Sequence, residues 1–150
     1  MNKSVKTTMK IDTKVLLSTL WIVVMFNMLK ADILSLYIPG AADELAKTAG
    51  ETPITLLMLG GAIMMEIAIV MILLSRVLPY RVNRWLNIIT GITTIAFVVG
   101  GGSSYPHYIF IAAVEVVCLL LIIWFAWRWP NPEKSASPAV LDQVEFSSHL

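Results

Sequence analysis

The chain has 150 residues, of which 57% are hydrophobic and 14% charged, with a net charge of +1 and a mean hydropathy of +0.77. A soluble domain carries about a quarter charged residues, so this composition excludes an ordinary soluble globular protein. The single cysteine, Cys118, excludes an internal disulfide and a Cys-x-x-Cys redox or zinc motif.

The apolar residues are gathered into four blocks, each separated from the next by polar or turn-forming residues. Blocks of this length predict an all-α fold, an integral membrane up-down antiparallel four-helix bundle. We expect residues 1–14 to form a basic N-terminal segment, residues 15–129 the transmembrane domain, and residues 130–150 a disordered tail rich in proline and serine. The four predicted spans are 15–38, 54–74, 85–99 and 107–127.

The connections between the spans differ in character. Pro39 and Gly40 end the first span, because neither residue continues a helix well. The polar residues 41–53 that follow predict a short interfacial helix. Within the second span, Gly60 and Gly61 favour a close contact between helices.

Lysine and arginine beside the spans predict the orientation in the membrane. Four lysines precede the first span, three arginines lie between the second and third spans, and Arg128 and Lys134 follow the fourth. Only Lys30 and Lys47 of the eleven basic residues fall elsewhere. We therefore expect both termini in the cytoplasm of a prokaryotic cell, with the protein in its inner membrane. The residues expected to anchor the cytoplasmic side in the lipid headgroups are Arg76, Arg81, Arg84, Trp85, Trp124 and Trp127.

Each predicted span also carries polar groups, and several of them fall at similar depths in the bilayer. Counting about 1.5 Å per residue, Lys30 and Glu115 lie roughly 12 Å from the outer ends of their spans and Glu66 roughly 18 Å. With Asp32 included, the spans hold three acids and only one lysine, Lys30. Lys30 cannot neutralise all three, so at least one carboxylate should be protonated or matched by a bound cation. The candidate ligand- or ion-binding residues are Asn27, Lys30, Asp32, Glu66, Thr94, Tyr108 and Glu115.

Two hypotheses follow for these intramembrane polar groups. In the first, they form a proton- or cation-responsive site for binding or transporting a small molecule, with Glu66 as the exchanging acid. In the second, the protein is a structural or accessory membrane subunit. Lys30 then pairs with a carboxylate across the bundle, and a polar stripe that includes Asn87 and Thr94 holds the helices together.

The sequence shows no nucleophile–base pair, phosphate-binding loop or dinucleotide-binding fingerprint, and we expect no enzyme activity and no cofactor. His107 and Glu115 do not share a helix face, and no second histidine is near them, so no metal site is expected. The expected partners are the lipid bilayer, a small-molecule or ion ligand, and either a second copy of the chain or another membrane protein. No nucleic-acid partner is expected.

Three stretches resemble a family of small four-helix prokaryotic membrane proteins of unknown function. They are residues 17–40, 59–89 and 111–127, and the most specific piece is Met-Glu-Ile at 65–67 followed by Leu-Leu-Ser-Arg-Val-Leu at 73–78 and Asn-Arg-Trp at 83–85. The resemblance implies four spans and a membrane location, and supplies no reaction. In size the chain is also similar to small multidrug exporters, which use an intramembrane glutamate for proton exchange. Here the glutamates fall in spans two and four rather than span one, so no functional residue is carried over.

The predicted orientation has a direct test. A reporter enzyme that works only in the cytoplasm should be active when fused after Leu150 and inactive when inserted near Ser103, because an even number of spans separates Leu150 from the N-terminus. A reporter that works only outside the cytoplasm should give the reverse pattern. Activity of the cytoplasmic reporter at Ser103, or its absence at Leu150, would contradict the orientation.

Overall fold

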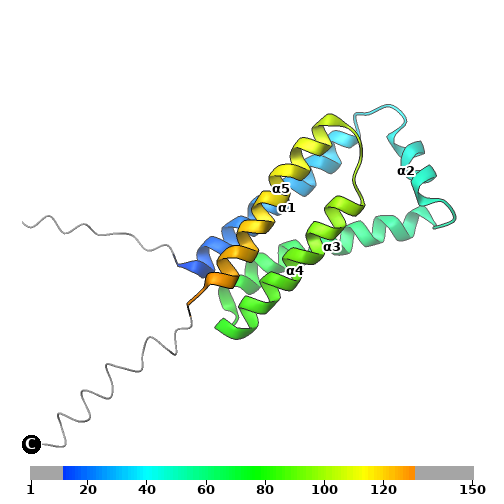
Figure 1. The fold of residues 1–150 in the computed structure, drawn as a ribbon. Coiled ribbons are helices and arrows are strands. Elements are labelled where there is room, and N and C mark those ends of the chain that lie inside the picture. The colour runs from blue at the N-terminus through cyan, green and yellow to red at the C-terminus, as the bar shows by residue number, and fades with distance from the viewer. Residues whose placement is uncertain (1–11, 131–150) are drawn as a thin grey trace, which may run out of the picture.

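The computed structural model describes residues 12–130, which form an up-and-down bundle of four long helices with one short helix between the first two (Figure 1). All four long helices are long and apolar enough to cross a membrane. The predicted all-helical fold and four spans are therefore confirmed, whereas residues 1–11 and the predicted disordered tail from residue 131 lie outside the described residues. The helices are α1 (Thr13–Ser35), α2 (Ala41–Ala49), α3 (Ile54–Val77), α4 (Tyr80–Gly100) and α5 (Pro106–Arg128).

Two predicted helix boundaries differ clearly from the structure. The first span ends at Ser35 rather than residue 38, and begins at Thr13 because the Asp12 side chain caps its N-terminus by accepting a hydrogen bond from the Lys14 N–H. The third span begins at Tyr80 rather than residue 85, so the predicted basic loop is almost entirely helical. Pro79 supplies the extended backbone before the first turn of α4. Arginines in terminal turns can extend toward water, which is why the basic residues do not end the helices.

The bundle has two distinct ends. At one, here called the terminal end, lie the start of α1, the α3–α4 turn and the end of α5 (Figure 1). At the other, the α2 end, α2 joins α1 to α3, and the expected short helix between spans one and two is confirmed. Gly40 and Gly50 bound α2 with positive φ angles of 82° and 56°, a conformation that favours glycine. The Tyr105 hydroxyl before α5 donates a 2.9 Å hydrogen bond to Glu44 of α2, which raises the pKa of Tyr105.

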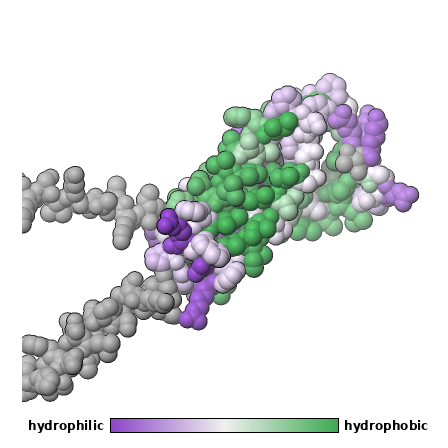
Figure 2. Space-filling view, in the orientation of Figure 1, coloured by the Kyte–Doolittle hydropathy of each residue, from purple (hydrophilic) through white to green (hydrophobic). Residues whose placement is uncertain are grey.

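The helices pack in a ring in which one seam is much looser than the others. Helix α1 packs extensively against α3 and α5, and α5 packs extensively against α4, whereas α3 and α4 make few contacts. The fully buried apolar side chains of α1 and α5 lie toward the terminal end: Leu17, Trp21, Val24, Leu119, Ile122 and Ala126. A hydrophobic band crosses the middle of the visible face between hydrophilic ends, as a bilayer requires (Figure 2).

A buried hydrogen-bond network centred on Asn87 joins three helices at the terminal end. The Oδ1 atom of Asn87 on α4 accepts from Trp21 Nε1 on α1 at 2.8 Å and from Ser75 Oγ on α3 at 3.2 Å. Asn83, one turn before Asn87, donates from Nδ2 to the Ser75 carbonyl at 2.6 Å. All four side chains are fully buried, so these polar groups rely on one another rather than on water. The predicted role of Asn87 in holding helices together is borne out by these contacts.

Two further contacts fasten the start of α1 to the end of α3. Ser18 Oγ donates to the Ile72 carbonyl at 2.9 Å and accepts from Arg76 Nε at 3.0 Å. Lys14 Nζ donates to the Leu78 carbonyl at 2.9 Å. The terminal half of α3 is therefore held by hydrogen bonds as well as by apolar packing.

The half of α3 near α2 is not held in this way. Residues 54–59 are all exposed, and Figure 1 shows this half of α3 diverging from the other long helices. A Cβ atom at Gly60 or Gly61 would meet nothing within 4 Å, so the predicted close helix contact at these glycines is absent within the described chain. The close approach lies instead at Gly91, where a Cβ would come within 2.9 Å of Ile123 Cγ1 on α5.

The Asn87 network predicts a specific loss of stability. Replacing Asn87 by alanine leaves the buried Trp21 N–H and Ser75 hydroxyl without their acceptor, and should lower the free energy of unfolding by about 1–3 kcal/mol. The measurement is reversible unfolding in mixed detergent micelles. Thr93→Ala is the matched control, because the exposed Thr93 hydroxyl bonds only to the Ile89 carbonyl of its own helix. A loss for Asn87→Ala no larger than for the control would contradict the structural role of Asn87.

Candidate functional site

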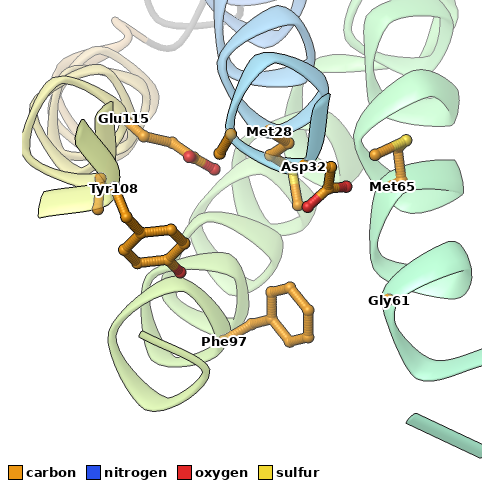
Figure 3. A pocket seen from close by; sticks show the side chains of 9 residues that line it. Met28, Asp32, Gly61, Met65, Phe97, Tyr108 and Glu115 are labelled. Atoms are coloured by element: carbon orange, nitrogen blue, oxygen red, sulfur yellow. The ribbon is translucent and has the colours of Figure 1, made fainter. Parts of the chain in front are cut away.

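A pocket of about 80 Å³ lies between the long helices in the half of the bundle near α2. Figure 3 shows it between α1 and α5 on one side and the diverging half of α3 on the other. The pocket lies where α3 separates from its neighbours. The sparse contact between α3 and α4 therefore accounts for the pocket. Its lining residues are Met28, Ala31, Asp32, Gly61, Met65, Phe97, Tyr108, Ala112 and Glu115.

Glu115 is the most unusual residue of the pocket. Helical spacing places Tyr108, Ala112 and Glu115 on one face of α5, and this face lines the pocket. The Glu115 side chain reaches from α5 toward α1 (Figure 3), is only 3% exposed, and its Oε1 atom has no hydrogen-bond partner. A buried carboxyl oxygen without a partner is costly, and such groups commonly mark a functional site.

Asp32 of α1 supplies a second acid to the pocket. It lies on α1 one residue after the buried Ala31, and its side chain faces the pocket between Met28 and Met65 (Figure 3). No lysine, arginine or histidine is among the lining residues. The described part of the chain therefore presents two acids and no base to this pocket, which gives it a negative electrostatic potential whenever either acid is ionised.

The remaining walls are aromatic and apolar. The Tyr108 hydroxyl donates to the Val98 carbonyl of α4 at 3.1 Å, which fixes the tyrosine ring across the gap between α5 and α4. Phe97 closes the α4 side, and the flexible side chains of Met28 and Met65 face it from α1 and α3. Methionine side chains adapt readily to ligands of different shape.

The structure brings together three of the seven candidate site residues, Asp32, Tyr108 and Glu115. Asn27 and Thr94 are buried but do not line the pocket, and the Thr94 hydroxyl donates to the Thr90 carbonyl of its own helix at 2.8 Å. The other two need correction. Lys30 and Glu66 are both exposed and neither lines the pocket.

These two corrections have one physical cause, the rotation of each helix about its axis. Glu66 follows Met65, which lines the pocket, and a step of one residue turns a side chain by about 100°. Lys30 lies two positions before Asp32 and is turned by about 200°. No ion pair joins Lys30 to a carboxylate among the described residues, so the predicted pairing across the bundle is absent there.

The predicted anchoring residues gather at the terminal end. The Arg84 guanidinium lies 5.4 Å from the centre of the Trp127 ring, and that of Arg128 lies 5.0 Å from the Trp124 ring. Trp85 is more than half exposed. Arg76 also bonds to Ser18, and its role therefore includes helix packing. The exposed Arg81 completes the group, and contact of these residues with lipid headgroups remains a prediction.

The sequence did not identify all of the residues that line the pocket. Met28, Met65 and Phe97 line the pocket but resemble every other apolar residue of the spans, so no signal distinguished them. Gly61 was noted in the sequence, but as a helix contact rather than as part of a pocket. Within residues 12–130, no group of three or more histidine, cysteine, aspartate or glutamate side chains is arranged to hold a metal ion.

The chain matches the model of one protein family. A family model described as a family of unknown function (DUF6326) matches residues 7–136, which is most of the sequence. The chain belongs to this family. No curated protein and no solved structure matches the chain. Membership of DUF6326 brings no reaction or ligand with it, so a proposal on function must come from the geometry of the pocket.

Proposed function

We propose that this DUF6326 protein binds a small organic cation in the pocket between Asp32 and Glu115, and that Glu115 gives up a proton when the cation binds. The observation that carries the proposal is the buried Glu115 carboxyl group, which faces the pocket with one oxygen unpartnered. Movement of the cation across the membrane would make the protein a transporter, and binding alone would make it a sensor.

The charge balance of the pocket favours a cation over an anion or a neutral sugar. Glu115 is buried and Asp32 is exposed beside it. An ionised Glu115 near a second acid needs a positive charge close by, because burial and the like charge both disfavour its ionised form. A protonated amine or quaternary ammonium group supplies that charge and leaves the site nearly neutral. An anion would meet only acids there.

The shape and lining of the pocket favour an organic cation over a metal ion. Its volume far exceeds the roughly 10–15 Å³ needed to hold one water molecule, and its walls combine Tyr108 and Phe97 with methionine side chains. Aromatic faces attract ammonium groups through cation–π interactions. Hard metal ions prefer six or more oxygen ligands, whereas the described residues hold no cluster of three or more histidine, cysteine, aspartate or glutamate side chains and this lining contains only two carboxylates.

Proton exchange follows from competition for the same carboxylates. A proton on Glu115 neutralises the site in place of the cation, so binding should weaken as the pH falls and strengthen as it rises. In this account Glu115, not the exposed Glu66, is the exchanging acid. We further propose that the protein acts in a prokaryotic inner membrane with the terminal end in the cytoplasm, on the basis of the basic and tryptophan residues there.

A structural or accessory role is the second candidate, and the Asn87 network favours it. Polar residues at the terminal end serve to hold helices together. This role does not account for the unpartnered oxygen of Glu115, which contributes no hydrogen bond to packing in the described residues. We therefore assign packing to the terminal end and ligand binding to the half near α2.

The proposal is tested by calorimetric titration of the protein in lipid nanodiscs with tetramethylammonium. Binding should strengthen from pH 5 to pH 8, and at the lower pH it should release up to about one proton per cation, counted by repeating the titration in buffers of different ionisation enthalpy. Glu115→Gln should abolish proton release and weaken binding about tenfold or more, because the amide cannot take a negative charge. Asp32→Asn should weaken binding while leaving proton release in place.

Glu66→Gln serves as the matched control, since it removes an intramembrane acid that does not line the pocket. It should leave cation affinity and proton release unchanged. Equal affinity in the wild type and Glu115→Gln, or binding that is independent of pH, would contradict the proposal. No binding by the wild-type protein would favour the accessory role.

A further inference from the structure

Glu66 lies near the middle of a membrane span on the outer surface of the bundle. It is 12 residues from the start of α3 and 11 from its end, which places it about 16–18 Å from both. Its side chain is turned about 200° from the buried Ala68, so it points away from the core. A carboxyl group facing hydrocarbon at this depth is costly, and it needs a partner from outside the bundle.

Lys30 is the complementary group on the same bundle. It is also exposed, and it is turned about 200° from the buried Met28 of α1. Neither Lys30 nor Glu66 makes an ion pair with another described residue. Within residues 12–130, Lys30 and Glu66 are therefore an exposed base and an exposed acid in the spans without an ion-pair partner in the same chain.

The packing of α1 against α3 gives the relative depth of the two charges. Ser18 on α1 bonds directly to the Ile72 carbonyl on α3, so these positions share a level. Lys30 is 12 residues beyond Ser18, about 18 Å, and Glu66 is six residues before Ile72, about 9 Å in the same direction. Helical side chains lean toward the N-terminus of their own helix. Because α1 and α3 are antiparallel, Lys30 leans toward the level of Glu66 and Glu66 toward that of Lys30.

We propose that a second copy of this chain covers the exposed face of α3, with Lys30 of each copy paired to Glu66 of the other. A two-fold axis along the membrane normal sets α1 of one copy antiparallel to α3 of its partner and preserves the depths within each chain. Extended lysine and glutamate side chains can bridge the remaining offset of about 9 Å. The symmetric dimer then contains two reciprocal ion pairs and leaves neither charge in lipid.

The uncovered half of α3 suits such a contact. A Cβ at Gly60 would meet nothing within 4 Å, so the backbone there is open to close approach by another helix. Apolar side chains around it are more than a third exposed: Leu56, Met58, Leu59 and Ile63. The Asp32–Glu115 pocket lies inside each chain, and the dimer does not depend on the proposed cation binding.

The test uses charge reversal in trans. Chains labelled at the C-terminus with donor or acceptor dyes are reconstituted into liposomes at increasing dilution, and energy transfer reports the dimer. Wild-type chains should associate. Lys30→Glu chains alone and Glu66→Lys chains alone should each lose association by more than about a hundredfold, because like charges would then meet across the interface. Mixing the two variants should restore association, since a mixed dimer contains one native pair of Lys30 with Glu66 and one pair in which the two charges are reversed.

Matched controls are Lys47→Glu and Glu51→Lys, which reverse exposed charges outside the spans and should behave like the wild type. A monomeric wild type, self-association of either reversed chain, or failure of the mixture would overturn the proposal. If the reversed chains do not insert, the neutral variants Lys30→Met and Glu66→Gln replace them. Each should weaken association about tenfold, and the double variant should be no weaker than the singles. If the two substitutions weakened association independently, so that the double variant lost the product of the two single losses, the pairing of Lys30 with Glu66 would be overturned.

Discussion

The side-chain amide of Asn87 determines how the rest of this bundle is arranged. One oxygen accepts hydrogen bonds from α1 and α3, and its helix presents Asn83 to the same part of α3. In a membrane, where apolar side chains gain little by leaving lipid, polar contacts and close packing hold helices together. Among the described residues, the side-chain hydrogen bonds of α3 to α1 and α4 lie in its terminal half, so α3 is held by hydrogen bonds at that end only.

This one-ended attachment explains why packing and a candidate ligand site coexist in so small a protein. At the terminal end the side chains of Trp21, Ser75 and Asn83 are joined through Asn87 by hydrogen bonds, and apolar side chains pack around them. Near α2, the divergence of α3 opens the pocket, and Glu115 and Asp32 face it without a base. The hydrogen bond of Tyr105 to Glu44 joins α2 to the start of α5 across this end. The same divergence leaves one face of α3 uncovered, where Glu66 lies.

The sequence predicted the number of spans and the polar residues of the pocket, but not how each helix is rotated. Four apolar blocks define four spans, and Asp32, Tyr108 and Glu115 are conspicuous in them. Because each span is apolar on all sides, its pattern does not show which face turns inward. Glu66 and Lys30 were therefore placed inside the bundle, although they lie on its surface. The start of α4 was missed because Arg81 and Arg84 interrupt the apolar run.

The central claim, that α3 is fastened at one end and free at the other, is tested most directly by distances between spin labels in nanodiscs. One pair, Leu57→Cys with Ile109→Cys, spans α3 and α5 near α2, and the other, Leu73→Cys with Leu120→Cys, spans them in the terminal half. All four positions are exposed, and both pairs are made in a Cys118→Ser background with labelled chains diluted in unlabelled ones. The account predicts a broad distance distribution for the first pair and a narrow one for the second. Equally narrow distributions at both ends would contradict it.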